Sequence, residues 1–211
     1  MIECPSCGRR QAPRLICENC GVPLGAEVDG FAVFSLRRKL VVDASALERV
    51  YHELSRQIHP DRFAQDSARV RAASLRSTAL LTRSYRTLRD PVARGLYWLE
   101  LHGEKLADRN QTVPPDLAEL VFEVQDELAE LRDARGADLE RLREGTRARR
   151  VELENAMNAL QGDLVRNFER WDAGGDAPQL IVELKAVLAK IAYLRTLLRD
   201  VDRGLENLQA A

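Results

Sequence analysis

The sequence is poor in apolar runs and aromatic residues, and each shortage excludes a class of protein. No apolar run approaches the ~20 residues that a membrane-spanning helix needs, so we expect no membrane partner. Only 5% of the 211 residues are aromatic whereas 31% are charged, which is typical of a soluble and mainly α-helical protein. The start of the chain, Met1-Ile2-Glu3-Cys4, has neither the basic region nor the apolar core of a secretory signal. These observations predict a cytoplasmic location.

The sequence also lacks the constellations on which enzymes depend. Its three histidines, His52, His59 and His102, are scattered and form no catalytic cluster. His59 could pair with Asp61 as a general acid, but no nucleophile and no glycine-rich phosphate-binding loop accompanies them. We therefore predict that the protein is not an enzyme.

The net charge of −1 conceals opposite charges in two parts of the chain. Residues 31–103 contain 13 Lys and Arg against 7 Asp and Glu, a local charge of +6. Residues 104–211 contain 16 against 22, a local charge of −6. This asymmetry predicts different partners for the two parts, although ordinary solvated helix faces would give the same pattern. The acidic part, and the lack of a basic stripe interleaved with aromatic residues, argue against nucleic acid as the main partner.

All four cysteines lie in the first twenty residues, as the pairs Cys4/Cys7 and Cys17/Cys20. In each pair two residues separate the thiols and a glycine follows, which permits the positive-φ turn of a metal-binding knuckle. Two such knuckles predict a closed site of four thiolates that holds one structural zinc ion. Iron in a rubredoxin-like electron carrier is the rival hypothesis. Disulfides are disfavoured because nothing indicates an oxidising compartment.

Helical patterns follow residues 22–30, a segment with one proline and two glycines that we expect to be a linker. Asp43 is placed to cap an amphipathic helix, and a second helix is expected from about residue 64 to residue 89. Asp90-Pro91 would end that helix and begin another. The tripeptide His59-Pro60-Asp61 lies between the first two helices, so we expect it at the exposed tip of a hairpin.

This layout resembles a J domain. The matching residues are Phe34-Ser35-Leu36, His59-Pro60-Asp61, and Ser84-Tyr85-Arg86-Thr87-Leu88-Arg89-Asp90-Pro91 with Arg94. More narrowly, His59-Pro60-Asp61-Arg62-Phe63 and Arg94-Gly95-Leu96-Tyr97-Trp98-Leu99-Glu100-Leu101-His102-Gly103 resemble HscB proteins, the co-chaperones of iron–sulfur cluster assembly. The resemblance covers residues 31–211, and the cysteine segment resembles the zinc-binding extension of some HscB proteins.

The resemblance implies an adaptor that binds an ATP-dependent chaperone of the HscA/DnaK class and stimulates its ATPase. It implies that His59, Pro60 and Asp61 carry this action. Proline limits the freedom of the loop, and a carboxylate can bind an arginine of the partner through two hydrogen bonds. The electrostatic contacts expected beside this tripeptide are Arg49, Arg56 and Arg62.

The remainder of the chain predicts a bundle of three helices. The first follows Pro114-Pro115 and runs to about Arg135, the second spans about Ala137 to Trp171, and the third begins at Pro178. The expected apolar seams are Leu117, Leu120, Val124, Leu128 and Leu131; then Leu153, Met157, Leu160, Leu164, Phe168 and Trp171; then Leu180, Leu184, Val187, Ile191, Leu194, Leu198, Val201, Leu205 and Leu208.

Two aromatic residues, Phe122 and Tyr193, lie off these seams. Phe122 shares a face with Asp126 and Glu130, beside Glu119 and Glu123, and an exposed aromatic residue among carboxylates predicts a protein-binding site. Packing of Phe122 against the J domain is the alternative. The resemblance places an IscU-like iron–sulfur scaffold on this face, held by Leu117, Phe122, Glu123, Asp126, Glu130 and Tyr193. The sequence departs from the family at Ala118 and Glu119, where an apolar pair is usual. A scaffold of altered surface, or another client protein, is therefore the alternative.

The predicted organisation is a cysteine segment with a linker at 1–28, a J domain at 29–103, a linker at 104–113 and a client-binding bundle at 114–211. The implied function is that of an iron–sulfur co-chaperone. The alternative is a general J-domain adaptor for another client, whose cysteine segment is an additional protein- or nucleic-acid-binding module. A small exposed apolar face also allows weak homodimers.

Overall fold

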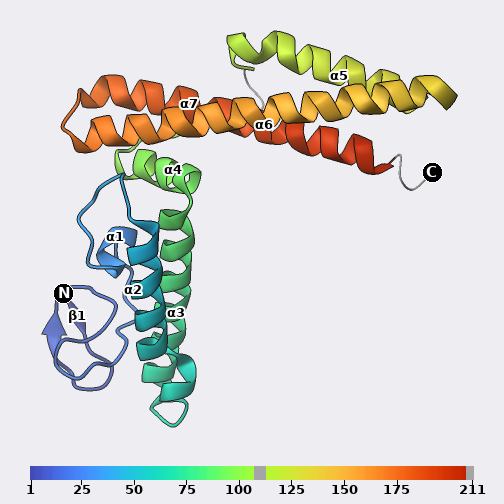
Figure 1. Cartoon of the computed structure of the whole chain (residues 1–211). Helices are drawn as coiled ribbons and strands as arrows, with labels where there is room; N and C mark the ends of the chain where they lie inside the picture. The colour runs from blue at the N-terminus through green and yellow to red at the C-terminus, as the bar shows by residue number, and fades with distance from the viewer. Residues whose placement is uncertain (107–112, 208–211) are drawn as a thin grey trace. The chain divides into compact units, whose positions relative to one another are not determined.

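The computed structural model describes residues 1–106 and 113–207 and divides into two compact units, Met1–Trp98 and Leu99–Ala211 (Figure 1). The described residues form seven α-helices, two short strands and two 3-10 helices. This confirms the predicted mainly α fold with a small cysteine segment at its start. Part of the predicted linker and Leu208 of the predicted seam lie outside the described residues. None of the described helices has the length and hydropathy that a bilayer crossing requires.

The first thirty residues fold around the cysteines with little regular structure. β1 (Ile2–Glu3) pairs antiparallel with β2 (Arg10–Gln11), and an isolated bridge joins Ile16 to Pro23. Its small apolar cluster consists of Cys4, Cys17, Leu24 and Ala26, and Gln11 and Leu15 are also buried. So small a core does not stabilise a fold by itself, which leaves a bound metal or packing against the neighbouring helices to hold the segment.

The expectation that residues 22–30 form a linker is wrong, because they pack against α3 (Ala68–Arg89). The backbone N–H of Gly25 donates to Oγ of Ser77 at 3.1 Å. A Cβ on Gly25 would lie 2.9 Å from Cα of Ala73, and its φ of +62° is one that glycine adopts without strain. Gly25 therefore permits a close approach of two backbones. Composition alone does not distinguish such a contact from a flexible connection.

α2 (Ala44–Ile58) and α3 form the hairpin of the first unit, with α1 (Gly30–Val33) beside them (Figure 1). Asp43 caps α2 as predicted, by accepting from the N–H of Ala46 at 3.0 Å. Tyr51 of α2 stacks on Tyr85 of α3, with ring centroids 4.1 Å apart. α4 (Pro91–Leu101) begins at the predicted proline.

The second helix of the hairpin begins later than expected. One 3-10 turn, η1 (Pro60–Phe63), follows His59, and α3 begins only at Ala68. The reason is local, since the hydroxyl of Ser67 caps α3 by accepting from the N–H of Val70. Such a cap requires a non-helical backbone at Ser67 itself, which stops any continuous helix from the loop.

The second unit consists of a 3-10 turn, η2 (Pro115–Leu117), and three helices, α5 (Ala118–Asp133), α6 (Gly136–Asp172) and α7 (Ala177–Asn207). α6 and α7 form a long pair, and α5 lies against them (Figure 1). The observed ends agree with the predicted ones to within a few residues. The predicted three-helix bundle is therefore the observed fold of this unit.

The predicted seam of α7 is wrong at three of its described positions. Leu188 and Leu197 are buried, whereas the predicted Val187, Leu198 and Leu205 are only half-buried. Strict steps of three and four follow a 3.5-residue period, whereas an α-helix has 3.6 residues per turn, so the buried line drifts over eight turns. On α6 the predicted Leu160 and Trp171 are also half-buried. The fully buried residues of α7 are Leu180, Leu184, Leu188, Ile191, Leu194, Leu197 and Val201.

Candidate functional site

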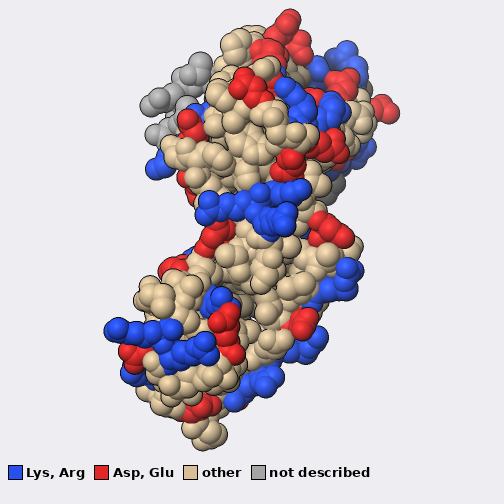
Figure 2. Space-filling view, turned by 90° about the vertical axis from the view of Figure 1, so that its left-hand side faces the viewer, with Lys and Arg blue, Asp and Glu red and all other residues tan. Residues whose placement is uncertain are grey.

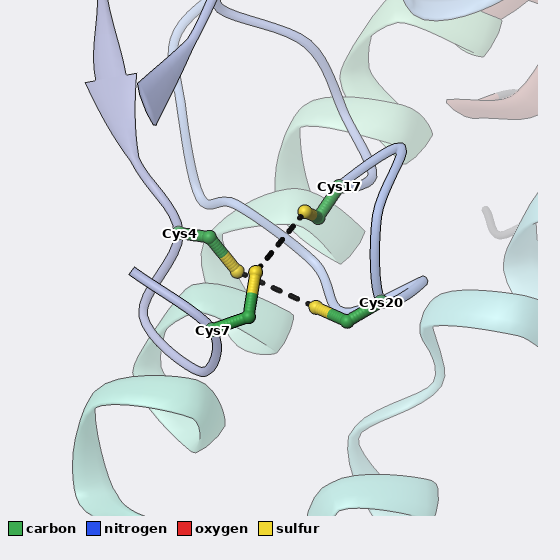
Figure 3. A group of neighbouring side chains, drawn as sticks. All are labelled: Cys4, Cys7, Cys17 and Cys20. Atoms are coloured by element: carbon green, nitrogen blue, oxygen red, sulfur yellow. Dashed lines mark hydrogen bonds between the residues drawn. The ribbon is translucent and has the colours of Figure 1, made fainter. Parts of the chain in front are cut away.

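The four cysteines converge, as their spacing predicts. Their sulfur atoms all lie within 4.8 Å of one another and point toward a common centre (Figure 3). Sγ of Cys4 lies 3.5 Å from Sγ of Cys20, and Sγ of Cys7 lies 3.8 Å from Sγ of Cys17. A tetrahedral zinc ion with Zn–S bonds of ~2.3 Å requires sulfur atoms about 3.8 Å apart. The distances are too long for disulfide bonds of ~2.05 Å, and all four thiols are free.

The two knuckles have the same backbone geometry. The N–H of Gly8 donates to the carbonyl of Cys4 at 3.1 Å, and the N–H of Gly21 donates to that of Cys17 at 3.0 Å. The φ angles of the two glycines are +72° and +73°. The positive-φ turn predicted from the sequence is therefore confirmed in both knuckles.

The surroundings of the cysteines stabilise negative charge at two of them. The pKa of Cys7 is lowered, first by the backbone N–H of Arg9. For Cys17, burial is the largest single influence and acts to raise the pKa. Hydrogen bonds from the backbone of Cys20 and from neighbouring groups together outweigh burial, so the pKa of Cys17 is lowered to about 6. Burial raises the pKa of Cys20 to about 12. A bound cation would favour the thiolate form of all four.

Gln11 lies in the core beside the four cysteine sulfurs, although the sequence gives no sign of this role. Its side chain is only 6% exposed, and its Oε1 accepts from the N–H of Glu18 at 3.3 Å. Its Nε2 has no hydrogen-bond partner of normal geometry among the described residues, yet the side chain helps to lower the pKa of Cys17. A buried amide donor beside a sulfur is satisfied when that sulfur is a metal-bound thiolate. The residues present therefore fit a tetrahedral metal ion.

The tripeptide His59-Pro60-Asp61 lies at the tip of the hairpin, as expected, and its base is anchored. The carbonyl of Ile58 accepts hydrogen bonds from Oγ of Ser74 at 2.7 Å and from Oγ1 of Thr78 at 3.4 Å. Nδ1 of His59 accepts from the N–H of Asp61 at 3.3 Å and caps η1. The loop is thus held by its backbone, while its polar side chains remain exposed.

The three arginines predicted beside this loop are exposed but do not all act alike. Arg62 donates to the carbonyl of Arg56 at 3.3 Å, so it covers the C-terminal end of α2 as well as facing solvent. Arg49 lies two helical turns before Arg56. α2 also carries Glu48 and Glu53, so its own charges balance.

The structure brings the predicted acidic face together on α5. Phe122 is 73% exposed, and Asp126 and Glu130 are exposed on the same side of the helix. Ala118 and Glu119 are also exposed, so the departure from the usual apolar pair lies at the surface. The remaining predicted residues, Leu117 and Tyr193, are half-buried.

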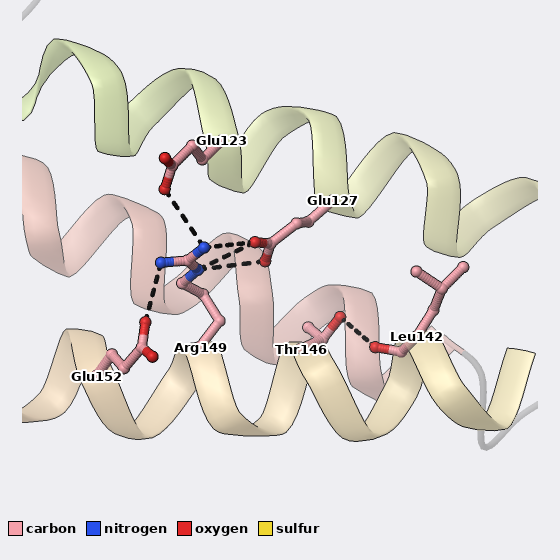
Figure 4. A network of polar contacts seen from close by, with 6 residues as sticks. All are labelled: Glu123, Glu127, Leu142, Thr146, Arg149 and Glu152. Atoms are coloured by element: carbon pink, nitrogen blue, oxygen red, sulfur yellow. Dashed lines mark hydrogen bonds and ion pairs between the residues drawn. The ribbon is translucent and has the colours of Figure 1, made fainter.

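Glu123, a predicted client-binding residue, is engaged within the bundle. The guanidinium of Arg149 on α6 contacts three carboxylates (Figure 4). Its Nη2 lies 3.3 Å from Oε2 of Glu123 and 2.6 Å from Oε1 of Glu127, and its Nη1 lies 2.9 Å from Oε2 of Glu152. The hydrogen bonds that Arg149 donates to Glu127, followed by the charges of the three carboxylates, raise the pKa of Arg149 against the effect of burial. The sequence does not show this cluster, because Arg149 lies far from α5 along the chain.

These ion pairs matter because α5 is held by few buried side chains. Only Val124 and Leu131 are fully buried among the described residues of α5. Asp116, just before the helix, pairs with Lys190 of α7 at 2.5 Å, and this contact lowers the pKa of Asp116. Arg149 and Lys190 therefore attach the candidate client-binding helix to α6 and α7.

The hairpin has His-Pro-Asp at its tip, a four-cysteine segment before it and a helical bundle after it. This is the layout that the resemblance to J-domain proteins predicts. No protein-family model matches the chain. The human co-chaperone protein HscB is similar to it, with a TM-score of 0.72 and 25% sequence identity over 95% of this chain and 96% of that chain. The chaperone HscB from Vibrio cholerae is also similar, with a TM-score of 0.64 and 23% identity over 86% of this chain and 99% of that chain. The chain therefore has the fold of the HscB co-chaperones, with a four-cysteine cluster at its start, and the resemblance predicted from the sequence is confirmed at the level of the fold.

We expect Arg149→Gln to loosen α5 from the bundle, because Glu127 and Glu123 lose their shared cation. The pair is partly exposed, so the expected loss in the free energy of α5 docking is about 1–2 kcal/mol. Hydrogen exchange should show faster exchange of α5 amides, with α6 and α7 still protected.

The matched control is Arg166→Gln, which removes an exposed ion pair with Asp163 inside α6. That change should cost less than about 0.5 kcal/mol and leave α5 unaltered. Equal exchange of α5 in both variants would show that Arg149 does not hold the helix.

Proposed function

We propose that the protein is a co-chaperone of iron–sulfur cluster assembly. In this role it stimulates ATP hydrolysis by an HscA/DnaK-class chaperone and delivers an IscU-like scaffold protein to it. The observation that carries the proposal is the exposed His59-Pro60-Asp61 loop at the tip of an anchored hairpin, in a chain with the HscB fold. The protein acts by binding two partners and performs no reaction of its own.

The geometry of the loop suits a contact with a cationic partner surface. The side chain of Asp61 is 90% exposed, and that of His59 is 52% exposed. Nδ1 of His59 is used as an acceptor within the loop, so Nε2 of the neutral ring is left as the donor toward a partner. An exposed carboxylate on a backbone of restricted freedom can bind an arginine with little loss of entropy. We propose Arg49, Arg56 and Arg62 as neighbouring contacts.

The acidic face of α5 supports the proposal of a protein client. Phe122 provides an apolar anchor, and Asp126 and Glu130 provide charges that no ion pair among the described residues neutralises. Such a face fits a basic client surface with an apolar recess. We propose Leu117, Glu123 and Tyr193 as further client contacts. The exposed Ala118 and Glu119 supply less apolar area than the family's usual pair, which favours a client of altered surface as the second candidate.

We propose zinc as the metal of the cysteine site. Four thiolates in a closed tetrahedral set leave no open coordination position, so the ion would stabilise the fold and would not catalyse. The ion would be held by Cys4, Cys7, Cys17 and Cys20. Because Gly25 packs on α3, an ordered cysteine segment would also stabilise the hairpin.

We expect His59→Gln to abolish stimulation of the chaperone ATPase. Loss of a central contact should cost about 2 kcal/mol or more in binding, which is about thirtyfold in affinity. The measurement is ATP turnover by a purified DnaK-class chaperone as a function of co-chaperone concentration. His52→Gln, an exposed histidine on α2, is the control and should behave as the original protein. Stimulation that survives His59→Gln would refute the J-domain proposal.

We expect Phe122→Ala combined with Tyr193→Ala to weaken retention of an IscU-like scaffold without altering basal ATPase stimulation. The exposed ring of Phe122 supplies most of the apolar contact, so the loss should be at least about tenfold in affinity. Pull-down with immobilised scaffold is the measurement, and Val182→Ala, at another exposed apolar residue of the bundle, is the control. Loss of both activities would indicate damage to the fold and not a binding face.

We expect the purified protein to be colourless and to contain one equivalent of zinc. Removal of the ion with a chelator should expose residues 1–30 to proteolysis while the helical signal of the hairpin remains, because the segment has little core of its own. Metal analysis and limited proteolysis measure the two effects. A coloured protein containing iron would support the electron-carrier hypothesis, and the loss of free thiols without metal would contradict both.

A further inference from the structure

The cysteine site would carry a net negative charge with its metal bound, because four thiolates around a divalent cation leave two negative charges. The first thirty residues have no cationic excess to balance these charges, since they contain three arginines against four acidic residues. One of the arginines, Arg14, is already paired with Glu18. On the face that Figure 2 shows, basic side chains are interspersed with acidic ones and form no continuous patch. The thiolates therefore depend on nearby N–H groups for stabilisation.

Backbone N–H groups supply part of this stabilisation within each knuckle, that is, within residues 4–8 and residues 17–21. The N–H of Arg9 is the first of the groups that lower the pKa of Cys7. At Cys17 burial acts to raise the pKa, and the N–H groups of Cys20 and Asn19 act to lower it. These donors lie near their own cysteine in sequence, so they do not connect one knuckle to the other.

The side chain of Gln11 does connect the two knuckles. Its backbone lies in β2, opposite Ile2 of β1, the strand that leads into the first knuckle. Its side chain reaches the second knuckle, where Oε1 accepts from the N–H of Glu18 at 3.3 Å. The other end of the carboxamide, Nε2, is buried and has no hydrogen-bond partner of normal geometry among the described residues. A buried N–H of this kind costs free energy unless an acceptor is at hand.

The acceptor at hand is the sulfur of Cys17. This residue immediately precedes Glu18, which holds the other end of the carboxamide, and it is itself only 3% exposed. After burial and the backbone N–H groups, the side chain of Gln11 also lowers the pKa of Cys17, as a hydrogen-bond donor does. A thiolate accepts such a bond better than a thiol does. A neutral amide can donate it from within the core, where an unpaired Lys or Arg would be costly to bury.

The first knuckle could not hold the carboxamide in the same way. Pro5 occupies the position in that knuckle that Glu18 occupies in the second, and proline has no backbone N–H. Because the two knuckles have the same backbone geometry, this missing donor is a difference of sequence and not of fold. The contact of Oε1 with Glu18 therefore directs Gln11 to the second knuckle.

We propose that Gln11 is a positioning residue of the cysteine site: its Nε2 donates to the thiolate of Cys17, its Oε1 holds the second knuckle through Glu18, and both contacts raise the affinity for the metal. This rests on the proposed zinc site. Gln11 supplies no ligand of its own. It acts through Cys17, by stabilising the thiolate and by fixing the second knuckle against the strand that leads into the first.

The test measures the full-length protein with zinc and with cobalt(II), a tetrahedral substitute whose charge-transfer bands report on the bound sulfur atoms. We expect Gln11→Met to lower the zinc affinity, measured by competition with a chelator, by about 10–100-fold. The thiolate-to-cobalt bands should move to longer wavelength, because a thiolate that loses a hydrogen bond gives up electron density more readily. Gln11→Glu has the same shape and keeps the acceptor for the N–H of Glu18, but it lacks the donor and should restore neither value.

The matched control is Gln57→Met, at an exposed glutamine of α2, which should alter neither the zinc affinity nor the bands. Unchanged bands in both Gln11 variants would overturn the proposal, because a loss of affinity would then reflect only packing or the contact with Glu18. Full recovery of affinity and band position in Gln11→Glu would also overturn it. If Gln11→Met does not fold around cobalt, Gln11→Glu decides, because its shape is that of the original side chain. An unaltered protein that binds neither zinc nor cobalt would refute the metal site itself, which is a separate result.

Discussion

The first unit depends on small side chains buried along α3, which let other backbones approach that helix closely. Ser74 and Ser77 are 0% and 1% exposed. Ser74 donates to the carbonyl of Ile58 and thereby anchors the base of the His59 loop. Ser77 accepts from the N–H of Gly25 and thereby anchors the cysteine segment. Larger residues at these positions would separate the backbones and remove both hydrogen bonds, so one helix positions two candidate sites.

The second unit places its candidate face under a different constraint. α6 and α7 share an extensive apolar seam, whereas α5 is held by two fully buried side chains and by ion pairs to Arg149 and Lys190. An interface of this kind is sensitive to salt and to charge. Glu123 forms an ion pair with Arg149 and is also a proposed client contact. The same carboxylate therefore contributes to the attachment of α5 and to its proposed binding role.

Local patterns were sufficient wherever the chemistry involves neighbours in sequence. The cap by Asp43 and the turns at Gly8 and Gly21 depend on a few adjacent residues, and the structure has them as predicted. Among the described residues, the seam of α7 was correct except at Val187, Leu198 and Leu205, because the period of a helix determines a face but not its drift over a long contact. The engagement of Glu123 by Arg149 was not predictable, since neither residue indicates the other.

The sequence by itself determined the cysteine cluster, the hairpin with His59-Pro60-Asp61 at its tip and the three-helix bundle, because each follows from residue type and spacing along one stretch of chain. Only the tertiary structure decided that residues 22–30 pack on α3, that Gln11 lies in the core beside Cys17, and that two arginines of α3 contact the segment that carries the cysteines. These features depend on which surfaces meet across long separations in sequence. The burial of a side chain and the distance between two backbones depend on how distant segments pack together, and no single segment determines them.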